Sequence, residues 1–270
     1  MTSLIGVGDN TVDTYIDEGI HFPGGNAVNV AVFAGRCGGK AAYLGALGDD
    51  SRGRLIQDAL NAEKVDISHC RTLEGIQNAY VEVKRVDGER EFGDWLLGAS
   101  SLLHLDDNDL DFIRSFDLVH SSIFSNLENQ IEVLKKASSC LSFDFSTYFE
   151  EREMLKTVLP HVDIAIFSAA DLEINELLKF VEEHSSRHSQ LFLMTQGEKG
   201  SWVLSGSTSI WQDIVPTKVV DTMGAGDAFI ASFLVEYYEG AALPKAMQRA
   251  AEFAAESCQN QGAFGYGQSF

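Results

Sequence analysis

The strongest constraint on the fold is a regular alternation of helical patterns and short apolar runs between residues 106 and 195. The apolar runs lie at 118–122, 141–145, 162–167 and 191–195, and the helical patterns that precede them lie at 107–116, 127–137, 151–159 and 171–183. Strands that are apolar along their whole length are buried on both faces, which is typical of a parallel sheet covered by helices. The sequence therefore predicts an α/β protein with a mainly parallel sheet.

Both ends of the chain extend this order. Predicted strands cover 3–7 and 41–47, a predicted helix covers 27–33, antiparallel edge strands are expected within 202–211, and two helices start near Gly224 and Pro244. The first strand ends in the polar turn Gly8-Asp9-Asn10. Open α/β sheets bind ligands beyond the carboxyl ends of their strands, so this turn is the first candidate site.

The segment between Gln77 and Trp95 departs from this order. Apolar and charged residues alternate on both sides of Asp87-Gly88, a pair that is typical of a hairpin turn. Such alternation indicates a sheet with one wet face. We therefore expect a single domain over residues 1–270 with a lid inserted near 72–100, and an ordinary edge hairpin is the alternative interpretation.

Charge and cysteine spacing narrow the class of protein. The chain has 40 acidic and 20 basic residues, and its formal net charge of −20 disfavours binding to nucleic acid or to an anionic membrane. Its apolar runs are all shorter than the roughly 18 residues that a membrane-spanning helix needs. Cysteines 37, 70, 140 and 258 lie too far apart for a disulfide framework or a metal cluster. A cytoplasmic enzyme is expected.

The densest chemical signal is the segment 221–229, Asp-Thr-Met-Gly-Ala-Gly-Asp-Ala-Phe, a turn of small residues that runs into an apolar helix. Gly224, Ala225 and Gly226 can present backbone N–H groups at the helix N-terminus, where the helix dipole also favours an anion. Asp227 would lie in the first helical turn, where it can take the proton from an attacking hydroxyl while the turn stabilises a transferring phosphoryl group. A capping aspartate after a glycine-rich turn is the alternative.

Segment 221–229 resembles the carboxyl-terminal signature of the ribokinase (PfkB) sugar kinases. A second set of residues resembles the amino-terminal signature of that family: Gly24-Gly25-Asn26-Ala27-Val28-Asn29-Val30-Ala31, together with Gly45, Gly48-Asp49-Asp50 and Gly53. The two signatures stand in the family's order, and the similarity covers the whole chain. The resemblance implies a Rossmann-like three-layer sandwich with a β-hairpin lid, and transfer of the γ-phosphate of ATP to a sugar hydroxyl with Mg²⁺.

The resemblance also implies roles for residues outside the 221–229 segment. The residues expected to bind substrate hydroxyls are Asp9, Asp13, Gly24, Gly25, Asn26 and Asn29. Local capping or turn bonding is the alternative for Asp13 and Asn29. The residues expected to bind the nucleotide are Thr195, Gly197, Lys199 and Gly200 of one loop, and Ala255 and Cys258 near the end of the chain. A solvated side chain is the alternative for Lys199, and helix packing is the alternative for Ala255 and Cys258.

The chain departs from the family at the expected metal site. Family members usually carry Asn-x-x-Glu after the strand that corresponds to 162–167, whereas this chain reads Ser168-Ala169-Ala170-Asp171. Asp171, or Glu173 beyond it, is the candidate to organise Mg²⁺ through water, and the sequence leaves open which carboxylate does so. By analogy with the family, Asp221 is a candidate for a monovalent-cation site that would take K⁺.

Further segments resemble the members of the family that phosphorylate the 6-hydroxyl of an amino-acid-linked fructose. These segments are 8–10, 24–32, Arg90-Glu91-Phe92-Gly93-Asp94, Asp117-Leu118-Val119-His120 and Phe143-Asp144-Phe145-Ser146. Such a substrate brings an ammonium group, and Glu91, Asp94 and Asp144 are candidates to meet it, with Asp94 the expected substrate residue. A fructokinase or another sugar kinase of the family is the alternative function, and a non-catalytic sugar-sensing protein is a remote one.

The sequence leaves open which amino acid or sugar the acceptor carries, which hydroxyl is phosphorylated and the oligomeric state. By resemblance, a homodimer through the lid is expected.

Overall fold

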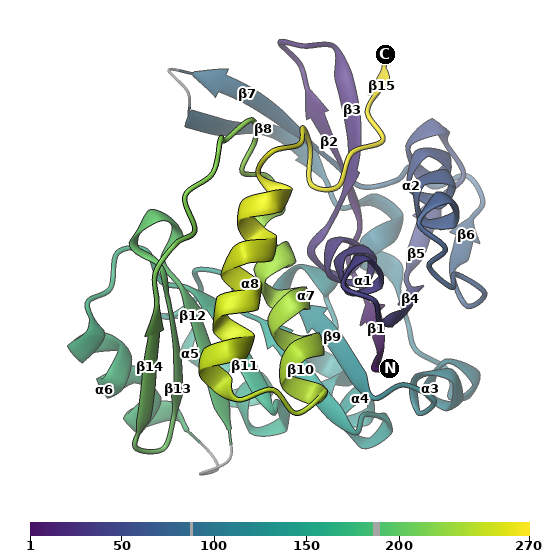
Figure 1. The fold of residues 1–270 in the computed structure, drawn as a ribbon. Coiled ribbons are helices and arrows are strands. Elements are labelled where there is room, and N and C mark those ends of the chain that lie inside the picture. The colour runs from purple at the N-terminus through teal and green to yellow at the C-terminus, as the bar shows by residue number, and fades with distance from the viewer. Residues whose placement is uncertain (87–88, 186–189) are drawn as a thin grey trace.

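The computed structural model describes residues 1–86, 89–185 and 190–270, so the predicted hairpin turn at Asp87-Gly88 lies outside the described residues. Its main sheet has eight strands in the order β14-β13-β12-β11-β10-β9-β1-β4 (Figure 1). The strands are β1 Ser3–Val7, β4 Lys40–Leu44, β9 Leu118–Ser122, β10 Cys140–Asp144, β11 Ile164–Ser168, β12 Leu191–Thr195, β13 Ser201–Ser205 and β14 Thr208–Gln212. Within this sheet β4, β1, β9, β10, β11 and β12 pair in parallel. Strands β13 and β14 add to its edge in antiparallel fashion, as predicted.

Helices cover both faces of this sheet. One buried apolar cluster takes side chains from α1 Asn26–Arg36, α2 Ser51–Ala62, α7 Ala225–Tyr238 and α8 Leu243–Ser257. The other takes side chains from α3 Asp107–Ile113, α4 Ile131–Ala137, α5 Arg152–Val158 and α6 Ile174–His184. Successive strand residues divide between the clusters, as Leu4 and Ile5 of β1 do, because strand side chains alternate between faces. The predicted three-layer sandwich is confirmed.

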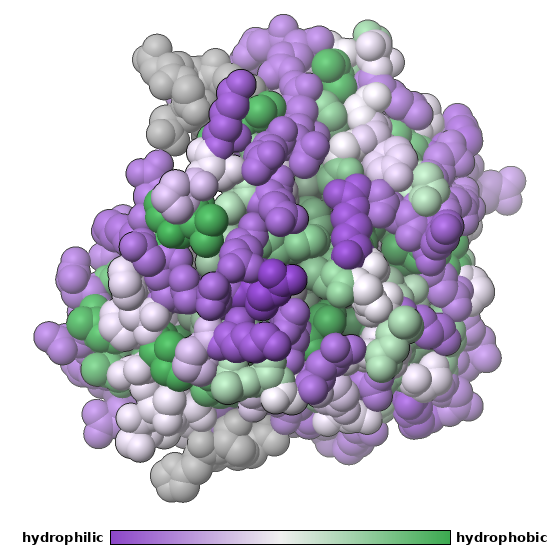
Figure 2. Space-filling view, viewed as in Figure 1, coloured by the Kyte–Doolittle hydropathy of each residue, from purple (hydrophilic) through white to green (hydrophobic). Residues whose placement is uncertain are grey.

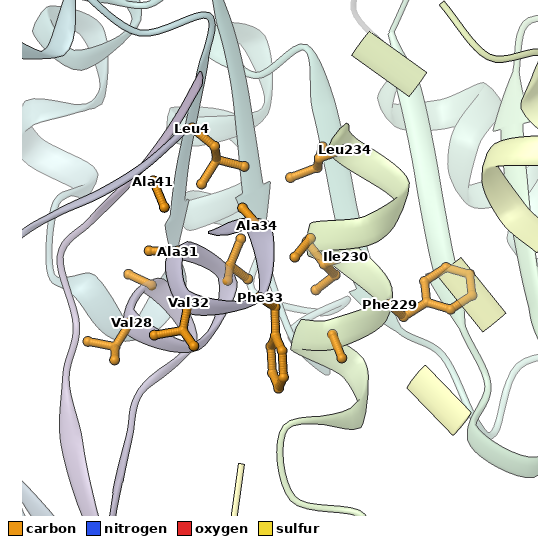
Figure 3. Close-up of a cluster of buried hydrophobic side chains, with 14 of the residues drawn as sticks. Leu4, Val28, Ala31, Val32, Phe33, Ala34, Ala41, Phe229, Ile230 and Leu234 are labelled. Carbon is orange, nitrogen blue, oxygen red and sulfur yellow. The ribbon is translucent and has the colours of Figure 1, made fainter. Parts of the chain in front are cut away.

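Helices α1 and α7 pack directly against each other on one face of the sheet. Figure 3 shows Phe33 and Ala34 of α1 on the side of the helix that faces Ile230 and Leu234 of α7, with Leu4 of β1 in the same cluster. All five side chains are at least 98% buried. This packing matters for function because the first turns of the two helices carry the two motifs that the sequence singles out.

A second sheet stands above the carboxyl end of β1 (Figure 1). Its order is β15-β3-β2-β7-β8, with β2 Thr11–Tyr15, β3 Ile20–Gly24, β7 Tyr80–Val86, β8 Glu89–Leu96 and β15 Gln268–Ser269. The expected antiparallel hairpin is present as β7 and β8. This hairpin is only part of the second sheet, because β2 pairs with β7 in parallel and β3 pairs with β2. The sequence analysis predicted neither β2 nor β3.

The prediction of one strand over 41–47 is wrong. The chain leaves the main sheet at Gly45, and β5 Ala46–Gly48 pairs instead with β6 Arg71–Leu73. A Cβ at Gly45 would lie 2.8 Å from the carbonyl oxygen of Gly8 and closer still to the Tyr43 ring. The break therefore follows from a close backbone approach that apolar periodicity does not reveal.

Short 3₁₀ helices occupy several connections: Gly98–Leu102, Ile123–Ser125, Glu128–Gln130, Leu159–His161 and Gly197–Lys199. The face of the molecule in Figure 2 is mostly hydrophilic, with smaller apolar areas between the polar ones. Within the described residues, none of the helices combines the length and the apolar character needed to cross a membrane. All four cysteines are free thiols, as expected from their spacing.

The position of α1 depends on a glycine in β1, and this dependence can be measured. A Cβ at Gly6 would lie 2.1 Å from the carbonyl oxygen of Ala27 in α1. Overpacking of this kind costs roughly 1–3 kcal/mol. We expect Gly6→Ala to lower the free energy of urea-induced unfolding by at least about 1 kcal/mol and to displace α1.

Gly35→Ala is the matched control, because it adds the same methyl group to α1 itself. Its Cβ would make an ordinary 3.4 Å contact with the Cβ of Ala41. Alanine is also the better helix former by up to about 1 kcal/mol, so this variant is expected to be at least as stable as the parent. Equal stability of Gly6→Ala and the parent would contradict the close approach of α1 to β1.

Candidate active site

Polar side chains from five elements meet where β1, β9 and β10 end and α1 and α7 begin. We call these residues the polar cluster: Asp9, Asn26, Asn29, His120, Asp144 and Asp227. Asp9 follows β1, Asn26 and Asn29 lie in the first two turns of α1, and His120 and Asp144 lie on β9 and at the end of β10. Asp227 lies in the first turn of α7. The cluster thus joins the two sequence motifs.

The Asp227 carboxylate is held by two amide side chains of α1. Its Oδ1 accepts a hydrogen bond from Nδ2 of Asn26 at 2.8 Å, and its Oδ2 accepts one from Nδ2 of Asn29 at 2.6 Å. Burial raises the pKa of Asp227 well above its ordinary value, the Asn29 bond lowers it, and the charge of Asp144 raises it further. The residue is only partly buried, so the carboxylate that two amides orient is still reachable. This geometry suits a base.

Asp144 is the second carboxylate of the cluster. Its Oδ2 accepts from the same Nδ2 of Asn26 at 2.8 Å, and its Oδ1 accepts from the backbone N–H of Ser146 at 2.8 Å. Burial raises the pKa of Asp144 to about 6, and the Ser146 bond opposes this shift. One amide group therefore serves two carboxylates at once.

Asp9 caps α1. Its Oδ2 accepts from the backbone N–H of Asn26 at 2.6 Å, and its Oδ1 accepts from Ala27 N–H at 3.2 Å and from the hydroxyls of Ser122 and Ser125 at 2.8 and 3.0 Å. Burial raises the pKa of Asp9, and these four donors oppose that shift. A carboxylate accepts about four hydrogen bonds. The expected contact between Asp9 and a substrate hydroxyl therefore stays a prediction, and the carboxylate has little acceptor capacity left for it.

The turn before α7 has the geometry of an anion cradle. Gly224 adopts the left-handed conformation with φ of 72°, and its carbonyl accepts the first intrahelical bond from Ala228 N–H at 2.8 Å. The N–H groups of Gly226 and Asp227 precede that bond and have no intrahelical acceptor. A Cβ at Gly226 would meet no atom within 4 Å, so open space lies beside the turn. The N–H groups of Gly226 and Asp227 can therefore hold an anion such as a phosphate, whereas the N–H of Ala225 already donates to the carbonyl of Thr222 at 3.2 Å.

The remaining expected substrate residues form the entry to α1. Asp13 is buried on β2 opposite Phe22 of β3, and a Cβ at Gly24 would lie 2.6 Å from its Oδ2. Gly25 has φ of 106°, and a Cβ there would lie 2.5 Å from Cα of Asn10. Both glycines are thus required by close approaches, and their contacts with substrate stay predictions.

The expected nucleotide residues lie in two places. Thr195 ends β12 beside Ser168 of β11, and Lys199 donates from Nζ to the carbonyl of Ala170 at 2.7 Å, so the 195–200 loop is tied to the loop that follows β11. Gly197 and Gly200 both have positive φ, at 56° and 90°.

Ala255 and Cys258, in contrast, are buried at the end of α8. The carbonyl of Cys258 accepts from the N–H groups of Val220 at 2.8 Å and Asp221 at 3.2 Å. It therefore anchors the approach to the 224–227 turn.

The two carboxylates expected at separate metal sites differ in their surroundings. Asp171 is exposed in the loop after β11. Asp221 is buried, and its carboxylate accepts from the hydroxyl of Tyr15 at 2.8 Å and from the N–H groups of Met223 and Gly262, each at 3.1 Å. Across the three described stretches, no group of three or more His, Cys, Asp or Glu side chains is arranged to hold a metal. A Mg²⁺ ion that arrived with a nucleotide would take most of its ligands from phosphate oxygens and water.

Asp94 lies apart from the polar cluster. It is exposed on β8, where the pairing with β7 shifts register between Val81 and Val83. Phe92 lies opposite Val83 and Trp95 lies opposite Val81, so β8 carries one extra residue at this point. The bulge interrupts the alternation of side chains, and no hydrogen bond described for the chain joins Asp94 to the cluster.

The sequence analysis missed several members of the site. His120, Ser122 and Ser125 were not assigned a role, and Asp144 was named only as a candidate for the substrate ammonium. For Ser122, Ser125 and Asp144 the usable signal was position, because each lies at or just beyond the end of a parallel strand. His120 lies inside β9, where the usable signal was its polarity. A buried polar side chain inside an otherwise apolar strand needs a hydrogen-bond partner, and the partner of His120 is Asn26 of the polar cluster.

Comparison with curated proteins and protein families supports one assignment. The description "pfkB family carbohydrate kinase" matches residues 3–265. The chain is 37% identical to fructosamine kinase FrlD of Bacillus subtilis over 267 residues, which cover 98% of this chain and 93% of that protein. It is 35% identical to fructoselysine 6-kinase of Escherichia coli over 264 residues, which cover 98% and 100%.

Solved structures show the same fold. An Arabidopsis thaliana ribokinase complexed with ribose and ATP matches with a TM-score of 0.83 and 22% identity, covering 97% of this chain and 94% of that one. A Vibrio cholerae fructokinase in a fructose, ADP and calcium ion bound form matches with a TM-score of 0.80 and 24% identity, covering 98% and 95%. Because the family description spans almost the whole sequence and two relatives exceed one third identity over nearly all of it, the chain belongs to the pfkB family of carbohydrate kinases.

Proposed function

We propose that this carbohydrate kinase transfers the γ-phosphate of ATP to the 6-hydroxyl of fructoselysine, with Asp227 as the general base. The observation that carries the proposal is the Asp227 carboxylate, which two amides orient at the N-terminus of α7. There the N–H groups of Gly226 and Asp227 have no acceptor within the helix. A base and an anion cradle within one helical turn are what phosphoryl transfer to an alcohol requires.

The residues divide the reaction between them. Asp227 accepts the proton of the attacking hydroxyl, and the N–H groups of Gly226 and Asp227 stabilise negative charge on the transferring group. ATP would supply the phosphoryl group, and Mg²⁺ bound with it would neutralise part of the charge on that group. The transfer is largely dissociative, so the hydroxyl loses its proton late and a carboxylate is a sufficient base. The loop 195–200 and the end of α8 are the proposed nucleotide side of the site.

The two curated relatives support the choice of sugar. Both are named for fructosamine or fructoselysine, and each aligns with almost this whole chain. Fructoselysine carries an ammonium group, which negative charge on the protein would attract. The Asp144 carboxylate supplies such charge in the polar cluster, and Asp94 supplies it on β8 of the second sheet. We propose that the second sheet acts as a lid over this site. Four further expectations stay predictions: a homodimer through the lid, a K⁺ site at Asp221, a water-mediated Mg²⁺ contact of Asp171 and a cytoplasmic location.

The first test measures ADP release from ATP and Mg²⁺ with fructoselysine, fructose, ribose and adenosine in parallel. We expect turnover with fructoselysine to exceed the others, and Asp227→Asn to lower kcat by about 10²- to 10⁴-fold, the usual worth of a positioned base. Binding of fructoselysine, followed by thermal shift, should persist in the variant because asparagine keeps the shape of the side chain.

Each other outcome of that assay has a defined reading. Faster turnover of fructose would replace the proposal with a fructokinase. A thermal shift with fructoselysine and no ADP from any sugar would favour the non-catalytic sugar-sensing protein. Full activity of Asp227→Asn would remove the base from the mechanism while leaving the substrate assignment intact.

The pH dependence of kcat/KM for the sugar tests the state of the base. Asp227 has to be ionised to accept a proton, and burial raises its pKa, so activity is lost as the pH falls through that raised value. Asp144, with a pKa of about 6, shares Asn26 with Asp227, and the two titrate as a pair. We expect the acid limb to lie well above about pH 4, where an ordinary aspartate titrates, and a profile that stays flat down to that pH would contradict the buried pair.

Asp94 is tested by comparing two sugars. If its carboxylate attracts the ammonium of fructoselysine, Asp94→Asn should raise KM for fructoselysine several-fold more than KM for fructose. Asp17→Asn is the matched control, because it removes the same charge from an exposed position of the same sheet, in the turn between β2 and β3. Equal effects of Asp94→Asn on both sugars would exclude Asp94 as a specificity residue.

A further inference from the structure

We propose that His120 is a positioning residue for the base Asp227 and acts through the side-chain amide of Asn26. This inference rests on the proposed function, because it concerns the residue that takes the proton from the sugar. It assigns a task to a fully buried histidine on β9, a strand that lies between β10 and β1 in the main sheet.

The geometry is a chain of hydrogen bonds that runs from the sheet to the base. His120 is 0% exposed on β9, and its Nε2 lies 2.8 Å from Oδ1 of Asn26. Nδ2 of Asn26 then donates to Oδ2 of Asp144 and to Oδ1 of Asp227, both at 2.8 Å. On the other side of the ring, Nδ1 of His120 lies 2.9 Å from Oγ of Ser142 on β10. Each link is within ordinary hydrogen-bond distance.

The direction of the chain follows from the donors available. The carbonyl oxygen of Asn26 can only accept, so His120 has to carry its proton on Nε2. Nδ1 then accepts from the Ser142 hydroxyl at 2.9 Å, in competition with the carbonyl of Val119, which lies 3.2 Å from the same hydroxyl. Burial lowers the pKa of His120 to about 3, which keeps the ring neutral and leaves it one N–H to donate. The histidine therefore fixes which end of the amide faces the two carboxylates.

The opposite orientation of the Asn26 amide would reverse its effect on the base. A flipped amide would place Oδ1 between the oxygens of Asp144 and Asp227, where it repels ionised carboxylates and favours protonated ones. The other charge that acts on Asp227 is the carboxylate of Asp9 from β1, and it also disfavours ionisation. Among these groups, the amides of Asn26 and Asn29 are the donors that stabilise ionised Asp227. Loss of the His120 donor should therefore make Asp227 a base only at higher pH.

The test compares His120→Gln with His120→Met in the full-length protein. Glutamine keeps an amide N–H that can reach Oδ1 of Asn26, whereas methionine fills similar space without a donor. We expect the methionine variant to move the acid limb of kcat upward by about one pH unit, with a loss of about tenfold in kcat below that limb. The glutamine variant should stay within about threefold of the parent, and KM for ATP should be unchanged in both.

A purely structural role gives a different pattern. In that case both variants lose thermal stability, and kcat falls by the same factor at every pH, which would overturn the proposal. An unshifted acid limb in a folded, active methionine variant would also overturn it. Loss of turnover in Asp227→Asn together with an unshifted limb in His120→Met would reject this inference and leave the proposed function standing.

A measurement on the unmodified protein keeps the proposal testable if both variants fail to fold. Nitrogen-15 chemical shifts of the His120 ring report which nitrogen carries the proton. We expect the Nε2–H tautomer at pH 8. The Nδ1–H tautomer at that pH would mean that His120 accepts from Asn26, and the proposal would be wrong.

Discussion

The site depends on how tightly α1 is bound to β1. Gly6 lets the backbone of the helix come against the strand, and the Asp9 carboxylate just beyond the same strand accepts the first N–H groups of the helix. A buried helix terminus needs such an acceptor, because its first N–H groups have no partner inside the helix. Asn26 and Asn29 are therefore fixed relative to the main sheet, and α7 is placed relative to them by the apolar contact between the two helices (Figure 3).

The polar cluster concentrates negative charge where an anionic phosphoryl group is proposed to pass. Asp9, Asp144 and Asp227 are mutually repulsive, and burial raises the pKa of each. The donors described for them are amides, hydroxyls and backbone N–H groups, which stabilise ionised oxygen without adding a full positive charge. Neutral donors leave the base strong enough to accept a proton, whereas an adjacent cation would lower its pKa and weaken it.

The sequence predicted the parts of this molecule that repeat a simple period. Parallel strands such as 118–122 and helices such as 171–183 follow from apolar patterning, and the 224–227 turn follows from its small residues. It did not predict the second sheet, because β2 and β3 are short and their pairing with β7 joins segments far apart in the chain. Gly45 ended a strand through a contact with Gly8, and the link from His120 to Asn26 spans elements that only the fold brings together. Local patterns contain no information about such distant contacts.

The hydrogen bond between Tyr15 and Asp221 has a mechanical consequence. Tyr15 lies on β2 of the second sheet, and its hydroxyl donates to the Asp221 carboxylate. That carboxylate also accepts from the N–H groups of Met223, just before α7, and of Gly262. The sheet above the site and the backbone that leads into the phosphate cradle therefore share one buried anchor. A displacement of β2 from the main body either pulls on residues 221–223 or breaks this bond, so the two parts of the site do not move as independent bodies.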